Sequence, residues 1–144
     1  MFVLVLLGSG IIVLLGIAHG IYTLRSTPEG GPMMPVNPEV REAMLVVDGI
    51  GLAPTLKTTL WKGWIGFNLS HSLGLIVVGL LIGLPVLEAL ASPMDNFAWL
   101  ICALLLPCLY LWLSIRHWFA KPTMGFAIAT ALICSGLAGQ ALLN

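Results

Sequence analysis

Four long runs of apolar residues divide the chain, and each is long enough to cross a lipid bilayer. A spanning helix needs about 20 predominantly apolar residues. The runs cover residues 1–24, 60–90, 97–119 and 122–143. Because the last three runs are joined by short connections, successive helices should be antiparallel neighbours. The pattern predicts an all-α integral membrane four-helix bundle with antiparallel up-down topology, forming a single transmembrane domain over residues 1–144.

The first apolar run does not have the features of a cleaved secretory signal. No basic residue precedes it, and no small-x-small cleavage site follows it. It is also longer than the about 7–15 apolar residues typical of a signal peptide. We therefore expect residues 1–24 to be retained as the first membrane span.

The polar segment 25–59 separates the first two spans and is broken by prolines. Four prolines between residues 28 and 38 prevent a regular element at its start. The order Asn37, Pro38, Glu39 then gives a cap, a proline at the first helical position and an acid in the first turn. We expect a short helix from Pro38 to about Val47, lying at the cytoplasmic membrane surface as an interfacial helix.

Composition supports a lipid environment and argues against several other classes of protein. Hydrophobic residues make up 59% of the chain and charged residues 8%, whereas soluble domains carry about 25% charged residues. Six basic residues balance six acidic ones. The chain therefore has no basic stripe for nucleic acid, and nucleic-acid binding is not expected.

The positions of the basic residues predict the orientation of the spans. Arg25, Arg41, Lys57 and Lys62 lie in or beside the first loop, and Arg116 and Lys121 flank the third. Loops rich in Lys and Arg stay on the cytoplasmic side of the membrane. The first loop, 25–59, and the third loop are therefore predicted to be cytoplasmic, and both termini to lie on the opposite side.

The three cysteines, Cys102, Cys108 and Cys134, all lie in apolar runs. Their odd number and the lack of a C-x-x-C spacing argue against a disulfide framework or a thiol relay. We interpret them as small buried hydrophobic residues.

Small residues recur at four-residue spacing in three of the spans, a pattern typical of closely packed membrane helices. The positions are Gly16 and Gly20 in the first span, Gly66, Ser70, Gly74, Gly79 and Gly83 in the second, and Ala127, Ala131, Ser135 and Gly139 in the fourth. Four helices of one chain are enough to use all of these faces. We therefore expect the small residues to pack within the chain rather than against another protein.

Three of the spans carry a histidine with polar neighbours on the same helical face. The three faces are His19, Tyr22 and Thr23; Trp64, Asn68 and His71; and Tyr110, Ser114 and His117. His117 is near the surface, whereas the others lie deeper in the cytoplasmic half of the bilayer. A polar side chain in lipid either hydrogen-bonds across helices as packing glue or marks a functional site. If the faces converge, they form a polar pocket of Tyr22, Asn68, Tyr110, Ser114 and His117 around His19 and His71.

The second span reads Trp64-Ile-Gly66-Phe67-Asn68-Leu-Ser70-His71-Ser-Leu-Gly74, and the first contains Gly16-Ile-Ala18-His19-Gly-Ile-Tyr22. These segments resemble an uncharacterised family of small bacterial four-helix inner-membrane proteins. The resemblance covers the first two spans and extends to the others by layout. It implies a bacterial inner membrane and no activity. In that membrane, the orientation predicted from the basic residues would place both termini in the periplasm.

Two kinds of function remain open from the sequence. One is an accessory or structural subunit of a larger bacterial membrane complex, whose partners are membrane lipids and other membrane-protein subunits. The other is a binding protein that uses the His/Asn/Tyr site, either for haem b held by His19 and His71 or for a lipid or quinone. No sequence motif names a catalytic residue or a metal site, so enzymatic activity stays undecided.

Overall fold

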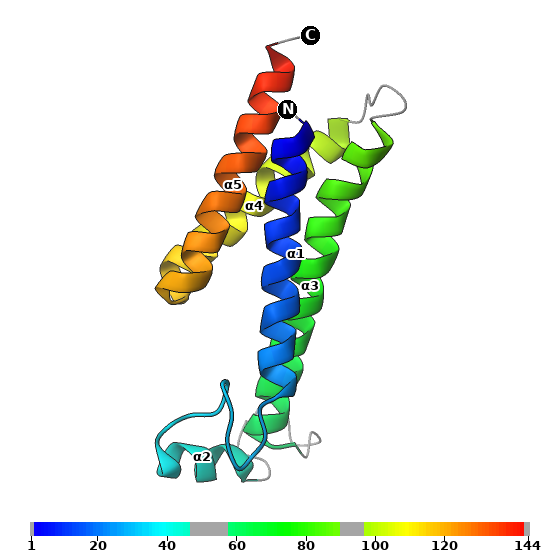
Figure 1. The fold of residues 1–144 in the computed structure, drawn as a ribbon. Helices are drawn as coiled ribbons and strands as arrows, with labels where there is room; N and C mark the ends of the chain where they lie inside the picture. The colour runs from blue at the N-terminus through cyan, green and yellow to red at the C-terminus, as the bar shows by residue number, and fades with distance from the viewer. Residues whose placement is uncertain (1, 47–57, 90–96, 143–144) are drawn as a thin grey trace. The chain divides into compact units, whose positions relative to one another are not determined.

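The computed structural model describes residues 2–46, 58–89 and 97–142. Within these ranges the chain forms five α-helices and no β-strand (Figure 1). The helices are α1 (Phe2–Leu24), α2 (Pro38–Leu45), α3 (Leu60–Glu88), α4 (Phe97–His117) and α5 (Ala120–Ala141). The predicted all-α class is thereby confirmed.

The helix bounds follow the apolar pattern closely. The structure confirms the predicted short helix: α2 begins at Pro38, and the Asn37 side chain accepts a hydrogen bond from the Glu39 backbone N–H at 2.9 Å. That bond satisfies one of the free backbone donors at the start of the helix. The last span begins at Ala120, two residues before the predicted Pro122, which lies in the first helical turn. A proline is tolerated there because the first turn needs no backbone donor.

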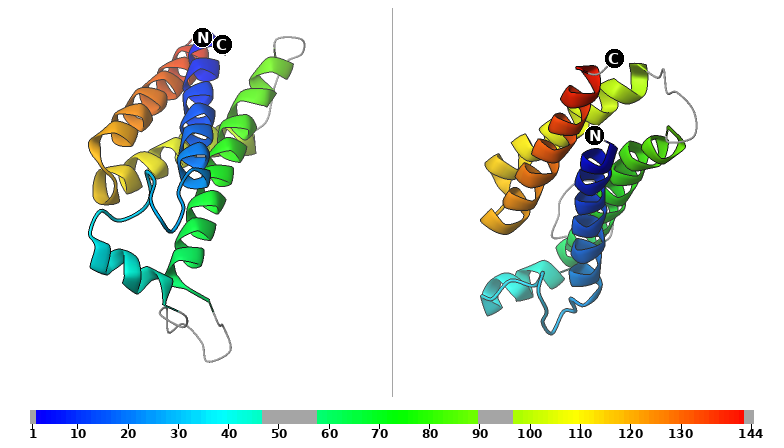
Figure 2. Two further views of the ribbon diagram at one scale, coloured as in Figure 1. Left: turned by 60° about the horizontal axis from the view of Figure 1, so that its bottom comes forward. Right: turned by 45° about the horizontal axis from the view of Figure 1, so that its top comes forward.

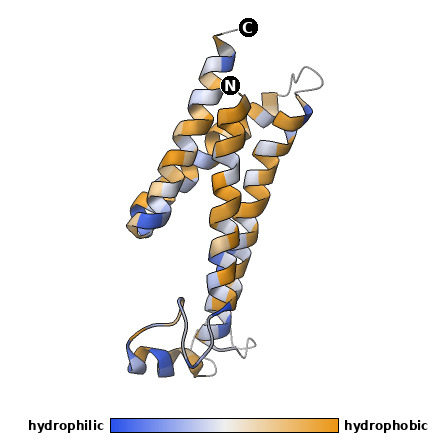
Figure 3. Ribbon diagram, viewed as in Figure 1, coloured by the Kyte–Doolittle hydropathy of each residue, from blue (hydrophilic) through white to orange (hydrophobic). Residues whose placement is uncertain are grey.

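The four long helices are long and apolar enough to cross a membrane. In Figure 3 hydrophobic colouring predominates on these helices, interrupted by pale and hydrophilic residues, whereas α2 carries a mixture of hydrophilic and hydrophobic residues. Only 17–33% of each span is buried inside the chain. Most of the apolar surface of these helices therefore faces outward, as expected when lipid or another membrane protein surrounds them.

The chain divides into two compact units. The first unit combines Met1–Leu15 with Gly74–Asn144, and the second is Gly16–Leu73. The first unit contains the start of α1, the end of α3, and the whole of α4 and α5; the second contains the end of α1, α2 and the start of α3.

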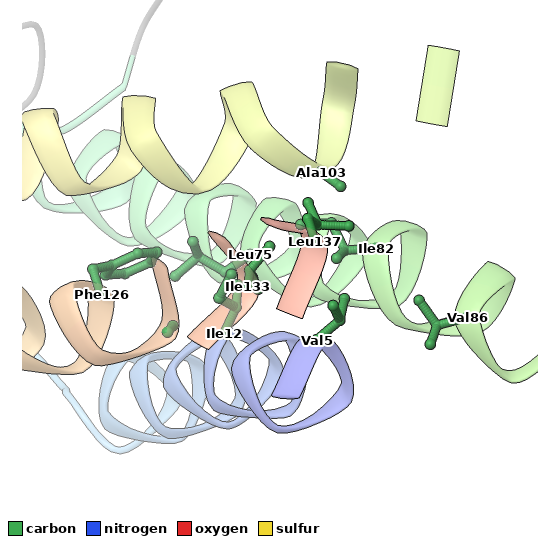
Figure 4. Packing of buried hydrophobic residues seen from close by; sticks show 10 residues of the cluster. Val5, Ile12, Leu75, Ile82, Val86, Ala103, Phe126, Ile133 and Leu137 are labelled. Atoms are coloured by element: carbon green, nitrogen blue, oxygen red, sulfur yellow. The ribbon is translucent and has the colours of Figure 1, made fainter. Parts of the chain in front are cut away.

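The first unit is built around an apolar core to which all four of its helical segments contribute (Figure 4). Ile12, Ile82, Phe126 and Ile133 are fully or almost fully buried there. Phe126 also stacks on Tyr110, with ring centroids 5.5 Å apart. Such stacking of aromatic rings between α4 and α5 adds stabilisation beyond the burial of apolar area.

Glycines allow the helices of the first unit to approach closely. A β-carbon at Gly79 in α3 would lie 2.5 Å from Val13 Cγ2 and 2.8 Å from the Ser9 carbonyl oxygen in α1. A β-carbon at Gly8 would lie 2.7 Å from the Ala129 carbonyl oxygen in α5. Close backbone approach at small residues is the usual packing mode of membrane helices. For Gly79 and Gly83, the predicted packing within the chain is confirmed.

Helices α4 and α5 lie side by side in Figures 1 and 2. The Thr130 hydroxyl in α5 donates to the Pro107 carbonyl oxygen in α4 at 3.2 Å. The Thr123 hydroxyl likewise donates to the Ser114 carbonyl oxygen at 3.1 Å. These two bonds fix the register of the pair.

The prediction of internal packing is wrong for three of the four residues on the small-residue face of α5. Ala127, Ala131 and Ser135 are exposed, whereas Gly139 is half-buried. The buried face of α5 instead carries larger side chains, Phe126, Ile133 and Leu137 among them. Spacing alone identified the small face, but the larger apolar side chains bury more area against α1 and α4 and therefore determine which face turns inward.

In the second unit, residues 26–46 fold against the first turns of α3. The Trp64 indole N–H donates to the Met33 carbonyl oxygen at 3.0 Å. Met34 and Met44 are buried in one small apolar cluster with Trp61. The Arg41 guanidinium donates to the carbonyl oxygens of Glu29 and Pro35, at 3.3 and 3.2 Å. Arg41 is therefore a structural clamp on this segment as well as one of the charges that predict orientation.

Candidate intramembrane polar site

A direct hydrogen bond joins α1 to α3 in the second unit. The Nε2 atom of His19 in α1 lies 3.0 Å from Oδ1 of Asn68 in α3. The Asn68 side chain is buried, at 5% exposure. Its amide nitrogen donates to the Trp64 carbonyl oxygen one turn earlier in the same helix, at 2.7 Å. Both the oxygen and the nitrogen of the Asn68 amide are thus hydrogen-bonded within the α1–α3 pair.

The bonding of Asn68 determines which nitrogen of His19 carries a proton. Because the Asn68 amide N–H₂ group points to a backbone carbonyl, its Oδ1 atom faces His19 as an acceptor. His19 Nε2 must then be the donor, and in the neutral imidazole Nδ1 has the free lone pair. Asn68 therefore orients the His19 ring and sets its tautomer.

His71 lies next to His19 and completes the cluster. The two imidazole rings meet edge to face, with centroids 5.4 Å apart. On its other side the His71 ring is stacked parallel to Phe67, at 6.4 Å. Phe67 is 66% exposed, so the cluster extends from a buried amide to the outer surface of α3.

The backbones of α1 and α3 run close together beside these histidines. A β-carbon at Gly20 would lie 3.4 Å from the Ser72 β-carbon, which is ordinary contact. The Ser72 hydroxyl is buried and donates to the Asn68 carbonyl oxygen, and the Thr23 hydroxyl donates to the His19 carbonyl oxygen. The hydroxyl groups of Ser72 and Thr23 are therefore each hydrogen-bonded to a backbone carbonyl of their own helix.

The remaining predicted site residues occupy different positions. Tyr22 is 52% exposed on α1 in the second unit. Tyr110, Ser114 and His117 belong to the first unit. Ser114 is fully buried and donates to the Leu111 carbonyl oxygen, whereas His117 is exposed at the end of α4. The structure thus brings together His19, Asn68 and His71, and the convergence of all three faces stays a prediction.

Sequence reasoning missed two residues that build this cluster. Phe67 stacks on His71, and Ser72 lies opposite Gly20, where an added β-carbon would touch it. Their positions directly before Asn68 and directly after His71 were visible in the sequence. Nothing in the spacing distinguished them from lipid-facing residues, because an isolated phenylalanine or serine is common in a span.

The arrangement of the two histidines does not fit a haem held by both of them. Axial ligands coordinate haem iron from the two faces of the macrocycle, so the ring must pass between the imidazoles. Here His19 Nε2 is bonded to Asn68, and next to it a β-carbon added at Gly20 would already touch Ser72, at 3.4 Å from its β-carbon. A macrocycle between these histidines would force α1 and α3 apart.

In residues 2–46, 58–89 and 97–142, no group of three or more His, Cys, Asp or Glu side chains is placed to hold a metal ion.

Comparisons with protein-family models, with curated proteins and with solved structures found no match. The resemblance carried by the first two spans therefore stays a prediction.

Proposed function

We propose that this protein is a small multi-pass membrane protein that acts as an accessory or structural subunit of a larger bacterial membrane complex. The observation that carries the proposal is the contrast between the small-residue faces. Gly8, Gly79 and Gly83 are used in contacts within the chain, whereas Ala127, Ala131 and Ser135 of α5 are exposed along one face. A face of small residues is the surface against which another membrane helix packs closely.

The polar site supports the same reading. Asn68 is satisfied at both ends of its amide, and it holds His19 by the bond that joins α1 to α3. Interhelical hydrogen bonds of this kind stabilise membrane helix pairs by about 0.6 kcal/mol on average. A cluster whose groups bond one another is suited to holding a helix pair together, which is the property a structural subunit needs.

The topology we propose is an antiparallel up-down bundle with α2 at the cytoplasmic surface of the inner membrane. In the first unit Ser9 of α1 faces Gly83 of α3, and Val13 faces Gly79. Contacts that move back along α3 as they advance along α1 support antiparallel neighbours. The distribution of basic residues favours periplasmic termini.

The experiment that tests the proposal compares two variants with the same substitution. Ala131→Phe places a large ring on the small face of α5, and Ala98→Phe does the same at an exposed alanine of α4. Each tagged variant is extracted from its native membranes in mild detergent, and the proteins that copurify are quantified by mass spectrometry.

We expect the wild type and Ala98→Phe to copurify with the same stoichiometric partner, and Ala131→Phe to lose it while keeping the wild-type melting temperature. The unchanged melting temperature shows that the substitution acts on the interface rather than on the fold. A wild-type protein that elutes alone would contradict the accessory role.

A second candidate is a binding site for a lipid or quinone at the His71 end of the polar cluster. The observation that favours it is the parallel stacking of His71 on the exposed ring of Phe67. A flat ring and an imidazole at the outer surface of a span are suited to an apolar ligand with a polar head.

Organic extraction of the purified protein, followed by mass spectrometry, tests this second candidate. A quinone or a single lipid species retained by the wild type and lost in His71→Leu would support it. Equal lipid content in the two proteins, with both folded, would rule it out.

A further inference from the structure

The segment Ser26–Val46 of the second unit has a defined fold, held by hydrogen bonds of its own side chains. The Ser26 hydroxyl accepts from the Met33 backbone N–H at 2.9 Å and donates to the Tyr22 carbonyl oxygen at the same distance. Gly31 has a φ of 133°, a conformation that suits glycine. Together with the Arg41 clamp, these contacts hold the segment in one conformation.

The contacts with α3 place this segment at one end of a candidate membrane span. Met33 is bonded to Trp64, which is the fifth residue of α3 and therefore lies about 6 Å along the helix from its first residue. Lys62 is exposed two residues earlier, and Arg25 is exposed directly after α1. Basic side chains at span ends lie at the level of the lipid headgroups. The segment therefore lies within about one helical turn of the headgroup layer.

The outer surface of the segment is apolar at defined positions. Val36 is 92% exposed and Val40 is 46% exposed. Met44 is buried, and the Arg41 guanidinium donates hydrogen bonds to the carbonyl oxygens of Glu29 and Pro35. On α2, Glu42 is exposed and lies about 160° around the helix from Val40, because successive residues are 100° apart. Val40 and Glu42 thus occupy different faces of α2.

We propose that Val36 and Val40 insert into the boundary between lipid headgroups and acyl chains, so that Ser26–Val46 is a membrane-interface anchor of the α1–α3 pair. The occupant of this surface is lipid. Leu60 and Phe67 of α3 are exposed apolar residues as well, and Arg25 and Lys62 lie at the same end of the pair, where they can meet lipid phosphate groups. The inference rests on the proposed insertion of α1 and α3 into the membrane, and it is independent of any partner subunit.

Nitroxide labels on single cysteines test this inference. The background carries Cys102→Ala, Cys108→Ala and Cys134→Ala, and its melting temperature is compared with that of the wild type. Labels are placed by Val36→Cys and Val40→Cys, with Glu42→Cys as the matched control on α2 and Phe67→Cys as the reference within a span. The protein is reconstituted in vesicles of phosphatidylcholine and phosphatidylglycerol. Collision rates of each label are measured with oxygen, which concentrates in lipid, and with a water-soluble nickel chelate.

We expect the labels at positions 36 and 40 to collide several-fold more often with oxygen than with nickel, as the label at 67 does, and the label at 42 to show the reverse. Nickel-dominated collisions at 36 and 40 would place this surface in water and overturn the inference. Low collision rates with both reagents would mean that protein covers it, and would overturn it equally. A nickel-dominated label at 67 would instead contradict the membrane insertion on which the proposed function rests.

Discussion

The two halves of the contact between α1 and α3 use different chemistry. In the first unit, a β-carbon at Gly79 would lie 2.8 Å from the Ser9 carbonyl oxygen, and one at Gly83 would lie 2.7 Å from the Ser9 hydroxyl oxygen. In the second unit, His19 bonds to Asn68, and Gly20 meets Ser72 at an ordinary contact distance. One half is held by close backbone approach and the other by side-chain hydrogen bonding.

This difference predicts how strongly the stability of each half depends on the exact shape of its residues. A β-carbon placed 2.8 Å from a carbonyl oxygen cannot be relieved by a side-chain rotation, because the obstacle is backbone. A lost hydrogen bond can be replaced in part by rearrangement of nearby polar groups. The glycine half should therefore be the more sensitive to single substitutions, although the histidine half looks more distinctive in the sequence.

The largest effect is expected from Gly79→Ala. Its β-carbon would meet Val13 and the Ser9 carbonyl oxygen, so the helices must separate, at a cost of about 1–3 kcal/mol in the free energy of unfolding. Gly66→Ala is the control, since nothing lies within 4 Å of the position its β-carbon would take. Reversible unfolding in detergent measures both. Equal stability of the two variants would refute the close approach at Gly79.

A smaller effect is expected from breaking the bond between His19 and Asn68. A double-mutant cycle of His19→Leu, Asn68→Leu and the double variant isolates the coupling free energy, which should be about 0.6 kcal/mol and no more than about 1.7 kcal/mol. Ser70→Ala is the control, because the exposed Ser70 hydroxyl bonds only the Phe67 carbonyl oxygen of its own helix. A coupling indistinguishable from zero would mean that the bond does not hold the pair.

The smallest effect is expected from Gly20→Ala. The added β-carbon would lie 3.4 Å from the Ser72 β-carbon, which is ordinary contact. Alanine also favours the helical backbone over glycine, so stability should rise by about 0.5 kcal/mol. The same unfolding assay applies. A loss as large as that of Gly79→Ala would show that both halves depend on close approach, and the comparison between them would fail.

The positions of the helices were predictable because their cause is local in the sequence. Apolar length sets each span, and the Asn37, Pro38 and Glu39 order sets the start of α2. The Gly79 and Gly83 pair was also identified by spacing alone. Spacing did not show which face of α5 turns inward, because that depends on the larger residues Phe126 and Ile133 finding partners on other helices.

The candidate site was predicted only in part, for a related reason. Facing positions on one helix follow from its geometry, so Asn68 and His71 were correctly grouped. That His19 would meet Asn68 depends on how α1 is rotated and shifted against α3, which no single helix encodes. The bonds of Trp64 to Met33 and of Arg41 to the loop were not predicted, because they join side chains to backbone carbonyls with no characteristic spacing.

The mass of the native particle tests the central proposal most directly. The wild-type protein is extracted from its own membranes in mild detergent, and native mass spectrometry gives the mass and composition of the particle. An accessory subunit predicts a particle much larger than the 15.4 kDa chain, containing other membrane proteins in fixed stoichiometry. A particle made only of one or more copies of this chain would contradict the account.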